Sequence, residues 1–292
     1  MRGTWLAWTA AGILAVATAS CATWQSAQVD PEDARDARLA VIHAMPATRP
    51  ASDFTWETDA IARGPRDEKV IALMFTGGEW GQGTDFILDE LARRGIKGAF
   101  YFTGDYLNTP AFRPGLRRMV AEGHLVGPHG HAHPLYAPWD DRSRTLVRRE
   151  EFVEDLRRNI EDVVALGIPR EQVIWWVPPY EWYNEQIVQW SLEEGMRLHN
   201  FTRGTLSSAD YTTADAANYR DSGTIFRSIV EYEAREPDGL NGFLLFTHVG
   251  ASPLRPDLFH YRLPELLDHL EARGYSFVRV DQLLQGAPLR PR

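Results

Sequence analysis

The sequence predicts an α/β fold, in which about seven strand–helix units form a closed (β/α) barrel. Two observations support this prediction. From residue 67 onward, short apolar runs alternate with longer amphipathic segments, and most of the amphipathic segments end at a glycine. Strands that alternate with helices are typical of a parallel sheet. A doubly wound open sheet is the alternative arrangement of the same elements.

Each predicted element follows from its apolar spacing. In the longest predicted helix, 148–166, the apolar residues Phe152, Leu156 and Ile160 recur every four positions, and Gly167 ends the helix. The predicted strands are apolar runs bounded by polar residues or glycine. We expect strands at 69–75, 99–103, 124–127, 173–177, 196–201, 242–247 and 275–280, and helices at 84–94, 112–122, 148–166, 185–194, 224–234 and 263–273.

Composition excludes several classes of protein. The chain has 292 residues, of which 44% are hydrophobic and 24% charged, which is ordinary for a globular protein and excludes wholesale disorder. Forty acidic residues against 31 basic residues give a net charge of −9. Because binding a phosphate backbone requires a basic face, we expect no nucleic-acid partner.

The N-terminus has the pattern of an export signal. Arg2 precedes an apolar run, 6–19, that is too short to span a bilayer comfortably, and Cys21 follows as the single cysteine of the chain. This pattern predicts an exported lipoprotein, cleaved before Cys21 and anchored there on the membrane, facing the periplasm or the cell surface. Ordinary secretion with cleavage after Ala19 is the alternative. The predicted organisation is a signal peptide (1–21), a tether or N-terminal extension (22–66) and one barrel domain (67–288).

A cluster of histidines predicts a metal site. In (β/α) barrels the active-site residues lie at the C-terminal ends of the strands. Four of the nine histidines fall between residues 124 and 133, directly after a predicted strand. His129 and His133 are four residues apart, and two neutral imidazoles at this spacing can bind one divalent ion. Solvated loop histidines without a ligand are the alternative.

These residues resemble the polysaccharide deacetylase family (carbohydrate esterase family 4, the NodB homology domain), from about residue 70 to residue 280. His129 and His133 are similar to the motif that supplies two metal-binding histidines. Leu245-x-x-His248 resembles the motif of the general-acid histidine, and Tyr180 the one whose backbone N–H binds the oxyanion. The resemblance implies a distorted barrel that removes N- or O-acetyl groups from glycans with a divalent metal ion.

Two other motifs of that family are incomplete here. Met74 to Gly78 read Met-Phe-Thr-Gly-Gly where Thr-Phe-Asp-Asp-Gly is expected, so the aspartates that act as base and as metal ligand are both absent. Val177 stands at the position of the arginine that orients the base. Asp210 and Tyr211 fit a further motif, with tyrosine in place of tryptophan.

We therefore consider two hypotheses. In the first, the protein is a metal-dependent hydrolase that acts on an acetylated glycan. Glu79 replaces the missing ligand beside the two histidines, or acts as the base, and the ion is Zn, Ni, Co or Fe. His248 is the general acid, Glu181 and Asp210 are candidates for the replacement base or for orienting a histidine, and aromatic residues stack on sugar rings. In the second, the barrel is a pseudoenzyme that binds carbohydrate without catalysis. In both hypotheses, the aromatic candidates for stacking on sugar rings are Trp80, Trp139, Trp182, Tyr183 and Tyr211.

The first hypothesis gives a direct prediction. We expect His129→Ala to abolish metal binding and activity without unfolding the domain, because the variant loses one of two imidazole ligands. Elemental analysis of the wild type, His129→Ala and Glu79→Ala measures this. A fully active, metal-free His129→Ala variant would contradict the prediction.

Overall fold

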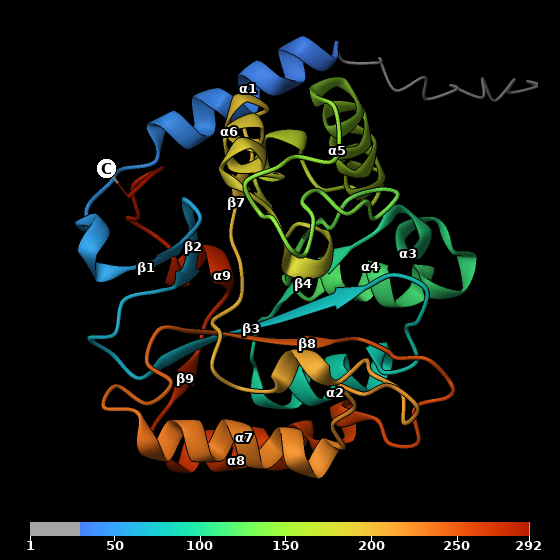
Figure 1. The fold of residues 1–292 in the computed structure, drawn as a ribbon, viewed down its shortest axis with the longest axis vertical. Helices are drawn as coiled ribbons and strands as arrows, with labels where there is room; N and C mark the ends of the chain where they lie inside the picture. The colour runs from blue at the N-terminus through green and yellow to red at the C-terminus, as the bar shows by residue number, and fades with distance from the viewer. Residues whose placement is uncertain (1–29, 292) are drawn as a thin grey trace, which may run out of the picture.

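The computed structural model describes residues 30–291 of the chain, and Figure 1 shows helices arranged around a central group of strands. The predicted signal peptide, 1–21, and the predicted anchor at Cys21 lie outside the described residues. None of the helices within 30–291 combines the length and the apolar character that crossing a membrane requires.

The central sheet is parallel. Strand β3 (Val70–Gly77) lies between β4 (Ala99–Phe102) and β8 (Phe243–His248). Strand β5 (Leu125–Pro128) continues the sheet beyond β4, and the short β9 (Ser276–Phe277) pairs with the beginning of β3. This arrangement confirms the predicted α/β fold with a parallel sheet.

The register of these strands brings their C-terminal ends to one edge. Thr76 lies opposite His248, and Gly77 lies opposite Phe102, which in turn lies opposite Pro128. Side chains that directly follow β3, β4, β5 and β8 therefore meet at the same rim, where the sequence motifs require them.

The remaining strands curve from β5 back toward β8. Strands β6 (Trp175–Trp176) and β7 (Arg197–Leu198) form a short parallel pair. The Val177 N–H donates to the Pro128 carbonyl at 3.3 Å, and the Thr202 N–H donates to the Leu244 carbonyl at 3.1 Å. The strands thus follow the course of a distorted barrel, part of which is closed by irregular chain.

Alternation along the strands divides the core in two. Leu73 and Phe75 of β3 lie in the larger apolar cluster, which the outer helices cover. Ala72 and Met74 lie in a second cluster with Phe246, on the opposite face of the sheet. Because neighbouring residues of a strand face opposite sides, one strand contributes to both clusters. Each large side chain buried in this way contributes about 1.5–3 kcal/mol relative to exposure.

The helices agree with the predicted ones within a few residues at each end. Helix α2 ends at Gly95, which adopts the left-handed conformation (φ 68°) that glycine tolerates best. The short helices α3 and α9 were not expected. The helices after the first strand are α2 (Thr84–Arg94), α3 (Gly104–Asn108), α4 (Arg113–Ala121), α5 (Arg149–Val164), α6 (Glu185–Glu193), α7 (Ser222–Arg235), α8 (Leu263–Ala272) and α9 (Val280–Leu283).

The segment before the barrel also contains regular structure. Helix α1 (Pro31–Ala44) lies against α5 and α6 (Figure 1), and the buried Arg38 guanidinium donates twice to the Glu194 carbonyl, at 3.0 and 3.1 Å. Strands β1 (Thr55–Glu57) and β2 (Ala60–Arg63) form an antiparallel hairpin. The part of the predicted N-terminal extension from residue 31 onward is therefore packed on the barrel.

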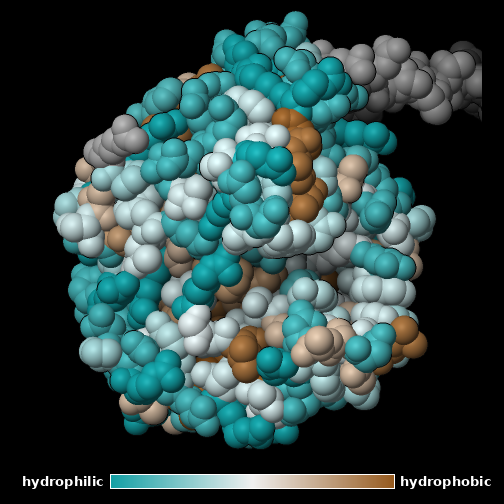
Figure 2. Space-filling model, in the orientation of Figure 1, coloured by the Kyte–Doolittle hydropathy of each residue, from teal (hydrophilic) through white to brown (hydrophobic). Residues whose placement is uncertain are grey.

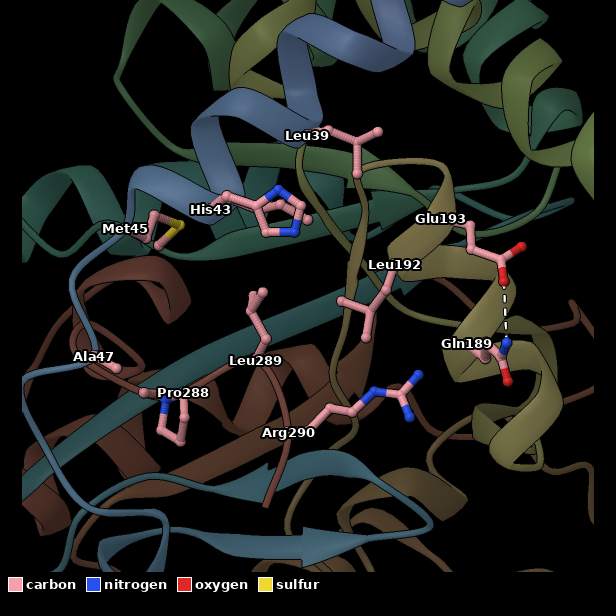
Figure 3. Close-up of a pocket in the computed structure, with 12 residues that line it drawn as sticks. Leu39, His43, Met45, Ala47, Gln189, Leu192, Glu193, Pro288, Leu289 and Arg290 are labelled. Atoms are coloured by element: carbon pink, nitrogen blue, oxygen red, sulfur yellow. Dashed lines mark hydrogen bonds between the residues drawn. The ribbon is translucent and has the colours of Figure 1, made fainter. Parts of the chain in front are cut away.

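The surface is largely polar and carries a cavity away from the motif residues. The face in Figure 2 is mostly hydrophilic and is hollowed near its middle, where apolar side chains are visible. A cavity of about 720 Å³ lies between α1, α6 and the C-terminal segment, and Figure 3 shows its lining. Leu39, His43, Leu192 and Leu289 line it, and no candidate residue of the rim does.

Candidate active site

The two predicted histidines lie together at the end of β5. The His129 ring is buried, and its Nδ1 lies 2.9 Å from the Val177 carbonyl oxygen. A carbonyl accepts a hydrogen bond, so Nδ1 carries the proton and Nε2 has a free lone pair. The His129 and His133 rings are 5.0 Å apart. Burial lowers the pKa of His129 well below its usual value and that of His133 to about 4. Both rings are therefore neutral at pH 7.

Glu181 faces this pair from the turn after β6. Tyr180 and Glu181 have φ angles of 59° and 50°, a left-handed conformation that is unfavourable for residues other than glycine. The Glu181 Oε1 lies 3.7 Å from the His129 Nε2, and the Glu181 side chain is 13% exposed. Burial raises the pKa of Glu181 to about 7, although the nearby His248 and Arg203 oppose the rise. A carboxyl group with this pKa can accept a proton at neutral pH.

His248, at the end of β8, is held by a carboxylate. Its Nδ1 lies 2.6 Å from the Asp210 Oδ1, and its backbone N–H donates to the Asp210 Oδ2 at 2.8 Å. Burial lowers the pKa of His248, but the carboxylates of Asp210 and Glu181 outweigh burial and raise it above the usual value. A histidine that keeps its proton in this way is suited to act as a general acid.

The third predicted metal ligand is not brought to the histidines. Glu79 is exposed, and no group of three or more His, Cys, Asp or Glu side chains within residues 30–291 lies in an arrangement that could hold a metal ion. His129 and His133 have the chemistry of metal ligands, but a hydrolytic centre uses three protein ligands. The described residues therefore bring two ligands of such a centre together, and the role of Glu79 as the third stays a prediction.

The packing around Gly77 leaves no room for an acidic side chain at this position. A Cβ atom added to Gly77 would lie 2.6 Å from the Val249 Cγ2 and 2.9 Å from the Phe102 Cε1. Real Cβ atoms essentially never approach other atoms so closely. Val249 and Phe102 are both fully buried, so neither can swing into solvent. The place where the family carries an aspartate is thus closed by apolar side chains.

Two of the predicted sugar-binding aromatic residues are engaged in packing. The Arg142 guanidinium lies 4.2 Å from the centre of the Trp182 ring, which is half-buried. Tyr183 is fully buried, and its hydroxyl donates to the Glu57 carbonyl at 2.8 Å. Trp80 is half-buried on the loop after β3.

Three other aromatic residues are open to solvent beside the acid and base groups. Tyr211 is 51% exposed, and its ring lies 5.0 Å from that of His248. Trp139 is 61% exposed and lies 5.8 Å from Tyr180, whose ring is in turn 4.4 Å from His133. Exposed aromatic rings thus flank the rim both at His248 and at His133.

The residues that hold the histidine loop are not among those expected from the sequence. Asp155, Asn159 and Asp162 of α5 all make hydrogen bonds to residues 129–132. The available signal was the buried Asn159, a polar residue beside the apolar positions of an amphipathic helix.

Comparisons with known proteins place these features in context. Residues 63–199 match the family model described as polysaccharide deacetylase. The chain is 27% identical over 236 residues to a peptidoglycan-N-acetylglucosamine deacetylase of Bacillus cereus, covering 80% of this chain and 75% of that protein. It is 36% identical over 132 residues to the peptidoglycan-N-acetylmuramic acid deacetylase PdaA of Bacillus subtilis, covering 45% of this chain and 46% of that protein.

Solved structures show the same fold. A pseudoenzyme of carbohydrate esterase family 4 from Bacillus anthracis superimposes with a TM-score of 0.61 at 16% identity, covering 79% of this chain and 70% of that one. At this identity the likeness establishes the fold alone.

The packing around Gly77 gives a prediction about stability. We expect Gly77→Asp to lower the free energy of unfolding by about 1–3 kcal/mol, as overpacking of a core typically does. Urea denaturation of the wild type, Gly77→Asp, Val249→Ala and the double variant measures this. Shrinking Val249 should make the aspartate less costly than it is in the wild-type background. Equal stability of Gly77→Asp and the wild type would refute the steric explanation.

Proposed function

Because residues 63–199 belong to the polysaccharide deacetylase family, we propose that the protein hydrolyses N- or O-linked acetyl groups of an acetylated glycan. The observation that carries this proposal is the pair formed by Glu181 and His248 on one rim. The pKa of Glu181 is raised to about 7, and that of His248 is raised by Asp210. One group is suited to accept a proton and the other to donate one at the same pH.

The chemistry follows from these two groups. Glu181 accepts a proton from the water molecule whose oxygen forms a bond to the acetyl carbonyl carbon. The carbonyl oxygen becomes negatively charged, and the Tyr180 backbone N–H is the proposed donor to it. His248 then donates its proton to the leaving nitrogen or oxygen of the sugar as the carbon–nitrogen or carbon–oxygen bond breaks. Acetic acid leaves and gives its proton to the released amine or to solvent, and proton transfer from Glu181 to His248 restores both groups.

The exposed aromatic residues support a glycan as the substrate. Sugar rings present apolar faces that pack on aromatic side chains, which lose little conformational entropy on binding. Trp139 and Tyr180 are exposed near His133, whereas Tyr211 is exposed beside His248. We propose peptidoglycan as the first substrate to test, since the relatives named above act on it. Export and anchoring through Cys21 are proposed from the sequence alone.

Metal dependence is a separate proposal. His129 and His133 are the residues that would bind a divalent ion, and such an ion would acidify water and polarise the acetyl carbonyl. Because no third protein ligand joins them within the described residues, the steps given above use only groups of the chain. Elemental analysis of the purified protein decides this proposal.

A pseudoenzyme is the second candidate function. The packing at Gly77 favours a pseudoenzyme. The family carries an aspartate at this position, and here apolar side chains fill the space that an aspartate would need. In that case the protein would bind acetylated glycans through the same aromatic residues and release no acetate.

Removing the proposed base should reduce turnover. We expect Glu181→Gln to lower kcat by 10²–10⁴-fold, the usual contribution of a positioned acid or base. Acetate release from N-acetylated peptidoglycan fragments measures this, with the exposed Glu185→Gln as the matched control. Similar rates in the wild type and Glu181→Gln would rule out Glu181 as the base.

Burial of Glu181 should also make the protein less stable at high pH. The pKa of Glu181 rises from about 4.5 to about 7 on folding, so the folded state binds this proton more tightly than the unfolded state does. The stability that the proton contributes is present below pH 4.5 and is lost as pH rises through 7. In the presence of a chelator, the stability of Glu181→Gln minus that of the wild type should therefore increase by about 3 kcal/mol as pH rises from 4.5 to 8, because only the wild type loses this contribution. A stability difference that does not change with pH would contradict the raised pKa.

The exposed aromatic residues should act mainly on substrate binding. We expect Trp139→Ala and Tyr211→Ala to raise KM for glycan oligomers severalfold with a smaller effect on kcat, because stacking holds the substrate equally before and during the reaction. Tyr261→Ala is the control, since Tyr261 is as exposed as Trp139 and its ring packs on Phe86 of α2 and on His260. An unchanged KM in both rim variants would exclude stacking at these residues.

A further inference from the structure

We propose that helix α5 positions the histidine loop, residues 128–134, through Asp155, Asn159 and Asp162. This role extends the proposed function to residues that touch neither the substrate nor the reacting atoms. The loop reads Pro-His-Gly-His-Ala-His-Pro, so it has no hydroxyl or amide side chain with which to bind its own backbone. Any such support must come from another part of the chain.

The loop also has no room for a supporting side chain at its second residue after β5. Gly130 has a φ of +76°, and a Cβ atom there would lie 2.6 Å from the Pro179 Cγ. A serine or threonine at this position would be strained by the backbone angle and would clash with Pro179. The turn therefore requires glycine, and glycine supplies no hydrogen bond from a side chain.

Helix α5 supplies these hydrogen bonds. The Asn159 Oδ1 accepts from the His129 N–H at 2.8 Å. The carboxylate of Asp155 accepts from two further backbone donors of the loop. Its Oδ2 accepts from the His131 N–H at 2.9 Å, and its Oδ1 accepts from the Ala132 N–H at 2.7 Å. Two side chains of one helix thus bind three backbone N–H groups of the loop, those of His129, His131 and Ala132.

Asp162 binds a side chain of the loop, the His131 ring. Its Oδ2 lies 2.6 Å from the His131 Nδ1, and its Oδ1 accepts from the Asn108 Nδ2 at 3.0 Å. The His131 ring lies against Gly104, at the start of α3, where a Cβ atom would overlap it. His131 is therefore wedged between α3 and α5 instead of pointing to the rim.

The spacing of these residues on the helix makes the contacts compatible. Residues 155, 159 and 162 differ by four and three positions, so they lie on one face of α5. They fix a loop whose last histidine, His133, has a φ of 52°. An unfavourable backbone angle persists only where surrounding contacts hold it, and the hydrogen bonds from α5 to residues 129–132 are among the contacts that hold this loop.

The first arm of the test measures the histidine rings directly and needs no substrate. Long-range ¹H–¹⁵N spectra of the full chain report the tautomer and environment of each ring. We expect Asp155→Ala to shift or broaden the His129 and His133 signals, while Glu154→Ala, which removes an exposed neighbouring acid on the same helix, leaves them unchanged. Asp155→Asn keeps one acceptor oxygen and should give an intermediate result.

A second variant covers the case in which Asp155→Ala does not fold. Asp162→Ala changes a side chain that is 14% exposed, and we expect it to alter the His131 signal and, through the loop, that of His133. Wild-type signals for His129 and His133 in every folded α5 variant would overturn the proposal.

The second arm measures catalysis and rests on the proposed function. With N-acetylated peptidoglycan fragments, we expect Asp155→Ala to lower kcat on the order of 10²-fold with little change in KM, because small displacements of catalytic groups have effects of this size. Absence of activity in the wild type would refute the proposed function, while the spectra would still decide the positioning role. Wild-type kcat in an Asp155→Ala variant with shifted histidine signals would show that the loop position does not control catalysis.

Discussion

The parallel register of β3 with β4 and β8 determines which side chains can reach the rim. Gly77 ends β3. It lies between Phe102, the last residue of β4, and Val249, which directly follows β8. Because both neighbours are large and buried, the end of the central strand is filled by apolar atoms. The acidic groups at this rim come from other segments: Asp210 from the chain after β7, and Glu181 from the turn after β6.

The turn after β6 supplies Glu181 at a cost in backbone strain. Tyr180 and Glu181 both adopt the left-handed conformation, and His133 on the facing loop does the same. Each such residue costs of the order of 1–3 kcal/mol, and strain of this kind is concentrated at functional sites. Burial of the Glu181 carboxyl group adds a further cost, which appears as its raised pKa. A purely structural turn would have little use for this combination of strain and buried charge.

Much of the fold and part of the site could be predicted from the sequence, because both depend on local spacing. Helix α2 begins and ends at the predicted residues, since its apolar spacing and Gly95 are local features. His129 and His133 lie together, because a short loop after one strand carries both, and their role as metal ligands stays a prediction. The family motifs identified His248 and Asp210 separately, and the structure joins these two distant segments by a hydrogen bond.

The features of the fold and of the site that were not predicted depend on contacts that residue order does not reveal. Glu79 was expected beside the histidines, but the loop after β3 leaves it exposed. The hairpin β1–β2 was not predicted, because its turn uses Thr58 and Asp59 at positive φ without a glycine to mark it. The positive φ of Glu181 has no sequence signal either, and the closure at Gly77 involves a residue 172 positions away along the chain, Val249.

The central claim is that Glu181 is a buried carboxyl group that titrates near neutral pH and replaces the missing acid of the rim. The most direct test is a pH titration of the glutamate side-chain carboxyl carbons by ¹³C NMR in the full-length protein, with Glu181→Gln used to assign the signal. The account predicts one glutamate with a midpoint near pH 7 that is absent from the variant. Titration of every glutamate in the ordinary range near pH 4.3 would contradict it.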